Sequence, residues 1–417
     1  MLPMTQKEDG ECPPVEHAVA AAEPEAAERL ASAEDTKKIW SADLFSGLGL
    51  HAWWSQSFAQ PAIYCEIDPS VRPLLLSAMH RGLVPKAPVH KDILDLEMPE
   101  GVEFITASWP CQGNSLCGKR KGMEDELSAL ILRVLELTHK AQPAMLFVEN
   151  VPGALGSTMR ILLDDMKASY DISWCCLGAC DVGLPHERSR FFCLLRRRDE
   201  DAAEMLRRAV ATSEAHQFVH QPEPKRMRAA TSRANTLRNA AIGNAICPAS
   251  AKKAFELMAR NLLDETERIP IFREQADLRP WGVCIGGKEY HTRPETFTAV
   301  NANLLFDPKA YAPPPTYKPR EVLKKEDILK EPQFKCLWPT PRHASVGTCH
   351  FLTHRAMRDL GTALRFERST PEEDRAGVVD ADWVEWLMGI PAGYTDEMRA
   401  GRIENTLQRR EEVVQGQ

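Results

Sequence analysis

The chain has 417 residues, of which 43% are hydrophobic and 27% charged, and its formal net charge is −7. A chain of this length and composition buries a large core and predicts two or more domains. It has no run of 18 apolar residues and no basic and apolar signal pattern at its start, which argues against a membrane or secreted protein. We therefore expect an intracellular protein, cytoplasmic in a prokaryote or nuclear in a eukaryote.

The first 38 residues differ from the rest in charge. They hold nine acidic and four basic residues, many alanines and prolines, and no aromatic side chain. Such a composition cannot bury enough apolar surface to fold, so residues 1–38 are predicted to be a disordered acidic leader. From about residue 259 the sequence becomes rich in loop-forming residues. This change predicts one domain at 39–258 and a second at 259–417.

From residue 39 onward, short apolar runs alternate with amphipathic stretches such as Leu127–His139. The runs predict strands at Ile39–Phe45, Ala62–Cys65, Phe104–Ala107, Met145–Val148, Ser173–Leu177 and Phe191–Leu195. This alternation predicts an α/β fold with a parallel sheet, which binds its ligands at the carboxyl ends of the strands.

The ends of the first three predicted segments suggest a nucleotide site. Gly47 and Gly49 follow the first strand and let the backbone pass close to a ligand. Glu66 follows the second strand, where an acid accepts hydrogen bonds from ribose hydroxyls, and Asp92 is placed to accept one from an adenine amino group. Because no G-x-G-x-x-G occurs, an adenosine-containing cofactor without a pyrophosphate fits better than a dinucleotide.

Reactive side chains follow the next strands. Cys111 comes after the run Phe104–Ala107, at a position that favours an exposed thiol, and Glu149 follows Met145–Val148. A thiolate is a good carbon nucleophile and a neighbouring carboxyl group donates protons. Arg188 and Arg190 alternate along the chain, so in a strand both would face the carboxylate and hold a polar planar base.

Other charged and sulfur residues leave more than one interpretation open. Residues 224–253 hold seven Lys or Arg and no acid, which suits contact with phosphates, a solvated helix face or a nuclear-import signal. Cys175, Cys176 and Cys180 lie in an apolar run and are predicted to pack in a strand. No C-x-x-C pair is present, so no metal site is expected.

With its motifs taken in order, the sequence resembles the cytosine-C5 DNA methyltransferases, in the arrangement of phage-type and bacterial enzymes. The motifs are D-L-F-S-G-L-G at 43–49, E-I-D at 66–68, P-C-Q-G-N-S at 110–115, G-K-R-K-G-M-E-D at 118–125, E-N-V at 149–151, R-S-R at 188–190 and I-G-N-A-I-C-P at 242–248. The W-L-M-G-I-P-A-G-Y-T stretch at 386–395 looks like a further family motif, displaced toward the C-terminus.

The resemblance implies a Rossmann-like sheet dependent on S-adenosylmethionine in 39–258, and a smaller, loop-rich target-recognition region in 259–417. It implies that Cys111 attacks carbon 6 of a cytosine flipped out of DNA, that Glu149 protonates or hydrogen-bonds ring nitrogen 3, and that Arg188 and Arg190 hold the site and the base oxygen. The cofactor would be lined by Phe45, Ser46, Gly47, Leu48, Gly49, Glu66, Ile67, Asp92, Pro110, Asn244 and Ala245.

Two other functions share this pattern: a tRNA cytosine-C5 methyltransferase, and a nucleic-acid-binding relative with weakened turnover. Departures from the family pattern occur at four positions, and the one at His186 adds a group expected to titrate near neutral pH. The chain is expected to be monomeric, with DNA as its partner and no membrane contact. The departures are Leu50, Asn114, His186 and Ala245.

Overall fold

The computed structural model describes residues 38–110, 130–155, 157–184, 186, 188–216, 218, 223–225, 227–228, 232–263, 268–270, 281–292 and 378–395. The predicted leader, apart from Lys38, lies outside these residues, as does Cys111. The chain separates into two units, residues 1–37 and residues 38–417, so that all described residues belong to the second unit. Within them, no helix has both the length and the apolar character needed to cross a membrane.

The centre of this unit is a ten-stranded sheet with the order β3-β2-β1-β4-β5-β7-β6-β10-β11-β9. Its first seven strands in chain order agree with the predicted apolar runs, apart from the two-residue β3, which was expected only as a candidate segment ending at Asp92. The strands are β1 (Ile39–Leu44), β2 (Ala59–Cys65), β3 (Val89–His90), β4 (Phe104–Ala107), β5 (Met145–Asn150), β6 (Tyr170–Leu177), β7 (Arg190–Arg197), β9 (Arg268–Pro270), β10 (Trp281–Ile285) and β11 (Lys288–Thr292).

The predicted parallel sheet is found in one half of the sheet, and the other half is antiparallel. β3, β2, β1, β4 and β5 run parallel, whereas β7 is antiparallel to both β5 and β6. Parallel neighbours require a long crossover, usually an α-helix, and β6 is joined to β7 only by the short 3-10 helix η3 (Cys180–Val182). β7 therefore returns beside β6 in the opposite direction, and the α/β class of the prediction is confirmed as a mixed sheet.

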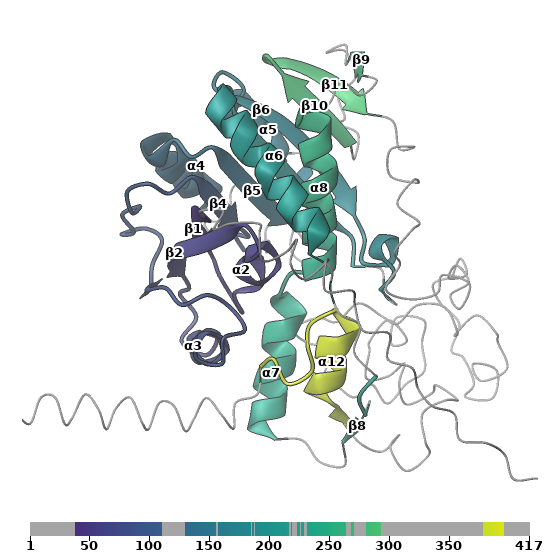
Figure 1. Ribbon diagram of the computed structural model, residues 1–417. Coiled ribbons are helices and arrows are strands. Elements are labelled where there is room, and N and C mark those ends of the chain that lie inside the picture. The colour runs from purple at the N-terminus through teal and green to yellow at the C-terminus, as the bar shows by residue number, and fades with distance from the viewer. Residues whose placement is uncertain are drawn as a thin grey trace, which may run out of the picture. The chain divides into compact units, whose positions relative to one another are not determined.

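Helices cover both faces of the sheet because each strand alternates apolar side chains between two cores. Phe104 and Phe147 belong to one core, and their neighbours Ile105 and Leu146 belong to the other. The first core is covered by α2 (Leu50–Ser55), α6 (Glu200–Ala215) and α8 (Pro248–Leu263); Figure 1 shows α6 and α8 lying across this face. The second is covered by α4 (Leu130–Ala141) and α5 (Ser157–Met166).

Two described parts of 259–417 join this same unit. β10 pairs antiparallel with β6, so residues 281–292 extend the sheet. Near the C-terminus, β12 (Val378–Val379) pairs with β8 (Met227–Arg228), and α12 (Ala381–Leu387) packs beside α7 (Arg233–Asn244), as Figure 1 shows. Residues 293–377, between these two parts, lie outside the described residues.

Candidate active site

The site forms where the strand order reverses. The chain passes from β1 to β2 on one side of the sheet and later to β4 on the other side of β1. Ligands of open α/β sheets bind at such a switch point, outside the carboxyl ends of the strands. The described residues that follow β1, β2, β4 and β5 therefore lie at one edge of the sheet, where this crevice is expected.

The turn after β1 has a backbone that favours glycine. The φ angles of Phe45, Gly47 and Gly49 are +57°, +54° and +74°. A Cβ atom on Gly49 would lie 2.7 Å from Leu75 Cδ1, so this position has neither the conformation nor the room for a larger residue. Ser46 ties the turn to β2, because its hydroxyl accepts a 2.9 Å hydrogen bond from the Cys65 amide.

Glu66, at the end of β2, contacts this turn directly. Its Oε2 accepts a 2.7 Å hydrogen bond from the Gly47 amide, and its Oε1 accepts one of 2.8 Å from the Asp68 amide. Burial raises the pKa of Glu66, and the two amide hydrogen bonds oppose this rise. Each carboxylate oxygen keeps a second acceptor site, which fits the hydroxyls of a ribose.

An apolar surface lies next to this carboxylate. Ile67 is 63% exposed, one of few large apolar side chains to face solvent among the described residues. Asp92, which follows β3, is half-buried, and its Oδ1 accepts a 3.0 Å hydrogen bond from the Leu94 amide. Glu66 and Ile67 follow β2 and Asp92 follows its parallel neighbour β3, so all three lie at the edge of the sheet where the sequence predicted an adenosine group.

The predicted acid at the end of β5 is held by one of the two predicted arginines. Glu149 is 7% exposed, and its Oε1 lies 3.1 Å from Arg190 Nε. The next residue, Asn150, donates a 3.1 Å hydrogen bond from Nδ2 to the Trp109 carbonyl. This bond fixes the end of β4 beside the end of β5, and the chain continues through Pro110 to Cys111. Cys111 itself, like the loop 113–122 and Asn114, lies outside the described residues.

Arg188 does not lie where strand alternation predicted. β7 begins only at Arg190, and the φ angle of Arg188 is +27°, so the two arginines do not share one face of a strand. Arg188 instead donates from Nη2 to the carbonyls of Gly243, at 3.0 Å, and Ala245. It thereby joins the R-S-R motif to the end of α7, where Asn244 is the last helical residue.

The expectation that His186 titrates near neutral pH is also wrong. The imidazole is fully buried, and this burial, aided by the positive charge of Arg188, lowers its pKa to about 3. A group with this pKa is uncharged at neutral pH, so His186 does not act there as a switch.

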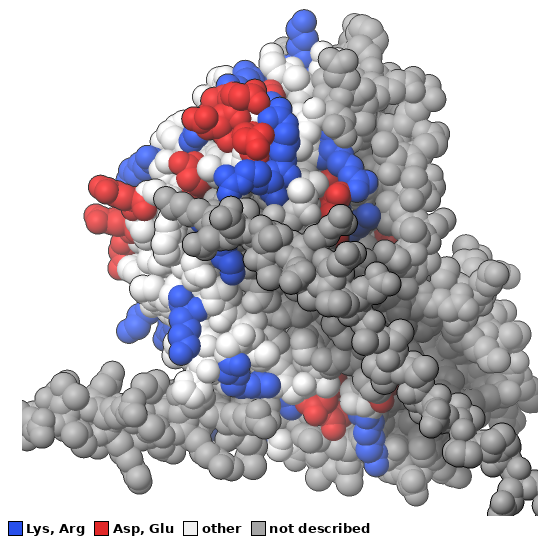
Figure 2. Space-filling model, in the orientation of Figure 1, with Lys and Arg blue, Asp and Glu red and all other residues white. Residues whose placement is uncertain are grey.

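The basic segment 224–253 is only partly available to an external phosphate. Arg238 is 6% exposed and is paired with Asp382 and Glu385. Lys252 is paired with Glu256. On the face drawn in Figure 2, described Lys and Arg side chains form separate patches, some next to Asp and Glu and others in uncharged surface, and not one continuous basic area. The charges of Arg238 and Lys252 are therefore balanced within the fold, and this part of the segment does not act as the free basic run that the sequence suggested.

Two contacts at the crevice were not predicted from the sequence. The Tyr394 hydroxyl donates a 2.9 Å hydrogen bond to the Leu48 carbonyl, within the glycine turn. His51 Nε2 lies 2.8 Å from Ser108 Oγ, at the end of β4. The only sequence signal for the first contact was the family-like motif at 386–395, and nothing in the sequence pointed to the second.

The chain is similar to known DNA methyltransferases, which differ in how much of it they cover. The chain is 26% identical over 376 residues to the Type II methyltransferase M.CviJI of Paramecium bursaria Chlorella virus IL3A, covering 84% of this chain and 96% of the relative. It is 28% identical to the Type II methyltransferase M.NlaIV of Neisseria lactamica, covering 36% of this chain and 39% of that protein. The chain thus spans well under half the length of the Neisseria relative.

Among solved structures, a putative DNA modification methyltransferase encoded within a prophage of E. coli aligns with 89% of this chain, at 15% identity and a TM-score of 0.37. The S. pombe Dnmt2 methyltransferase aligns with 39% of it, at 20% identity and a TM-score of 0.32. Residues 39–299, which contain the glycine turn, Glu66, Glu149 and both arginines, match the family described as C-5 cytosine-specific DNA methylase. The resemblance seen in the sequence is thereby confirmed: the chain belongs to this family and is a DNA cytosine-5 methyltransferase.

Proposed function

We propose that this chain methylates a cytosine flipped out of DNA by forming a covalent bond between Cys111 Sγ and carbon 6 of the base. The observation that supports this most directly is the ion pair of Glu149 and Arg190, 3.1 Å apart, beside the Asn150 to Trp109 hydrogen bond. The carboxyl group and the backbone that leads to the thiol therefore lie at the ends of adjacent strands. A base in this crevice would meet both groups.

Each residue has a defined part in the reaction. Carbon 5 of cytosine is a poor nucleophile until the Cys111 thiolate adds to carbon 6, which moves the electrons of the 5,6 double bond toward carbon 5 and the ring. Glu149 stabilises the developing charge by hydrogen bonding or protonating ring nitrogen 3, and Arg190 holds Glu149 and the base oxygen. Carbon 5 then takes the methyl group, and loss of its proton allows the bond to Cys111 to break.

The cofactor we propose is S-adenosylmethionine, which supplies an electrophilic methyl group when bound. Glu66 would accept hydrogen bonds from the ribose hydroxyls, while Ile67 would pack on the adenine and Asp92 would accept from its amino group. The glycine turn 45–49 would pass beneath the remainder of the molecule. Pro110, Asn244 and Ala245 would complete the site from the ends of β4 and α7.

Target recognition is proposed for residues 293–377. Residues 281–292 pair with the sheet and residues 378–395 pack in its core cluster, so the longest part of 259–417 left for this role is the stretch between them. Long connecting segments commonly carry binding residues.

A mechanism-based substrate tests the proposal. A DNA duplex with 5-fluorocytosine at the target should form a covalent adduct with the protein in the presence of cofactor, because fluorine cannot leave as a cation and the last step stalls. The target is first located by bisulfite sequencing of treated plasmid DNA. The Cys111→Ser variant should form no adduct. Adducts on transfer RNA, but on no DNA duplex that the protein methylates, would contradict DNA as the substrate and keep the catalytic assignment.

A further inference from the structure

A segment near the C-terminus contacts the middle of the glycine turn. The Tyr394 hydroxyl donates a 2.9 Å hydrogen bond to the Leu48 carbonyl across 346 positions of sequence. Leu48 lies between Gly47 and Gly49, whose positive φ angles make this turn sensitive to the direction of each peptide group. Both Tyr394 and Leu48 are buried, so water does not compete for the carbonyl.

The backbone that carries Tyr394 is fixed by one buried carboxylate. Glu385 is fully buried, and its side chain accepts hydrogen bonds from three successive amides: Gly393 at 2.5 Å, Tyr394 at 3.1 Å and Thr395 at 2.7 Å. Arg238 Nη2 lies 3.0 Å from Glu385 Oε1 and balances its charge. A carboxylate that is paired and bonded in this way orders the loop it contacts.

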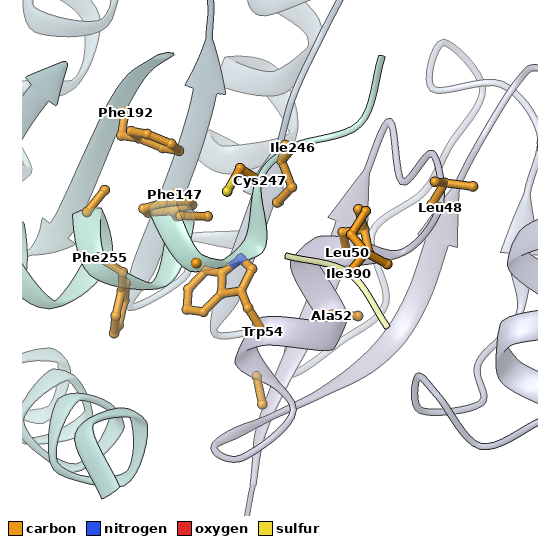
Figure 3. Packing of buried hydrophobic residues seen from close by; sticks show 14 of the residues in the cluster. Leu48, Leu50, Ala52, Trp54, Phe147, Phe192, Ile246, Cys247, Phe255 and Ile390 are labelled. Carbon is orange, nitrogen blue, oxygen red and sulfur yellow. The ribbon is translucent and has the colours of Figure 1, made fainter. Parts of the chain in front are cut away.

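Two further contacts hold this loop against the part of the fold that carries the glycine turn. Arg81, which follows α3 (Arg72–His80), donates from Nη1 to the carbonyls of Gly393 at 2.6 Å and Tyr394 at 3.0 Å. Ile390 and Leu50, the first residue of α2, belong to the same buried cluster, and Figure 3 labels both. The loop 388–395 is therefore held by Glu385, by Arg81 and by the buried cluster, and its Tyr394 hydroxyl reaches the glycine turn.

We propose that Tyr394 is a positioning residue for the methyl-donor site. Its hydroxyl fixes the peptide between Leu48 and Gly49, whose N–H donates a 2.7 Å hydrogen bond to the Ser46 carbonyl. That bond in turn orients the peptide between Ser46 and Gly47, whose N–H meets Glu66. The inference rests on the proposed role of this turn in holding S-adenosylmethionine. It makes cofactor affinity depend on a segment that directly follows the proposed recognition stretch 293–377. The hydrogen bond to Leu48 acts on the turn and not on the reacting atoms.

The chain offers a matched control. Tyr170 is also fully buried, and its hydroxyl donates a 2.9 Å hydrogen bond to a backbone carbonyl, that of Pro143, before β5. Tyr394→Phe and Tyr170→Phe thus remove the same group and the same kind of bond. A purely structural role would make the two variants alike in every measurement.

The test measures binding of S-adenosylhomocysteine to the full chain by calorimetry, alongside thermal unfolding. Tyr394→Phe should raise Kd by about tenfold, the effect of one buried hydrogen bond, with KM for the methyl donor raised and kcat little changed. Tyr170→Phe should bind S-adenosylhomocysteine as tightly as wild type does, while losing about as much thermal stability as Tyr394→Phe. Equal affinities for wild type and Tyr394→Phe, or an equal weakening in both variants, would overturn the inference.

The variant Glu66→Gln distinguishes an error in the positioning role of Tyr394 from an error in the proposed cofactor site. If Glu66→Gln weakens binding and Tyr394→Phe does not, only the positioning role is wrong. If the wild-type protein binds no S-adenosylhomocysteine, the proposed cofactor site and the positioning role are both wrong.

Discussion

His51 and Ser108 join the helix after the glycine turn to the strand end that leads to Cys111, through a contact of 2.8 Å between Nε2 and Oγ. Trp54 Nε1 lies 3.3 Å from His51 Nδ1, and an indole nitrogen only donates, so Nδ1 must accept. Burial lowers the pKa of His51 to about 3, so its ring is neutral and the proton is on Nε2. The hydrogen bonds therefore run from Trp54 to His51 and from His51 to Ser108.

Replacing His51 should lower the free energy of unfolding, and the variant that loses more of its hydrogen bonds should lose more stability. His51→Leu leaves the buried Trp54 N–H without an acceptor and should lower the free energy of unfolding by about 1–3 kcal/mol. His51→Gln keeps a donor for Ser108 and should recover part of that loss. Urea denaturation measures both, and equal stabilities of the two variants would contradict the assigned directions.

Cys111→Ser should abolish methyl transfer and leave cofactor binding near normal, because a hydroxyl is a far weaker nucleophile of similar size. Cys117, six positions further along the chain, is the rival thiol, and Cys117→Ser should be nearly silent. Transfer of tritiated methyl groups to DNA distinguishes them. Turnover of Cys111→Ser within about tenfold of wild type would move the nucleophile elsewhere, since a lost nucleophile costs far more.

Replacing Arg190 should mainly slow the reaction, and replacing Arg188 should mainly lower stability. Arg190→Ala removes the partner of Glu149 and should lower kcat by about 100-fold or more, the usual contribution of a positioned acid. Arg188→Ala removes the hydrogen bonds to Gly243 and Ala245 and should lower stability by about 2–3 kcal/mol. Single-turnover rates and denaturant unfolding separate the two effects. A stability loss for Arg190→Ala as large as that for Arg188→Ala would argue against this division.

The buried His186 predicts a dependence of stability on pH. Its pKa is about 3 in the folded chain, against 6.5 for an ordinary histidine of the unfolded chain, so below pH 6.5 the unfolded state binds a proton that the folded state does not. Stability from this group is therefore full above pH 6.5 and is lost as the pH falls toward 3. His186→Gln should flatten this part of the profile of unfolding free energy against pH, and an unchanged slope would contradict the buried, neutral ring.

Glu66→Ala should weaken S-adenosylmethionine binding by about 1–3 kcal/mol, the scale for hydrogen bonds to a charged group, with DNA affinity unchanged. Calorimetry with the cofactor and fluorescence anisotropy with a DNA duplex give the two affinities. Asp68→Ala is a fair control, because it removes a nearby carboxylate that is not predicted to touch the ribose. Unchanged cofactor affinity in Glu66→Ala would reject the ribose assignment.

The sequence by itself determined the strands and which residue types stand at their ends. The short apolar runs of β1 and β4 are followed by Gly47 and Pro110, and that of β5 ends with Glu149 and Asn150; both the pattern and the motifs are local in sequence. Because the carboxyl ends of parallel strands meet at one edge, these residues can be assigned to one crevice without knowledge of the packing.

Only the tertiary structure decided how distant segments complete that crevice. The φ angle of Arg188 turns its side chain to Gly243, Arg238 is paired with Glu385 instead of facing a phosphate, and Tyr394 reaches Leu48 across 346 residues. Each depends on which surfaces the fold brings together and buries. Periodicity describes how a segment meets a core, but it carries no information about which remote carbonyl or carboxylate will lie within hydrogen-bond distance.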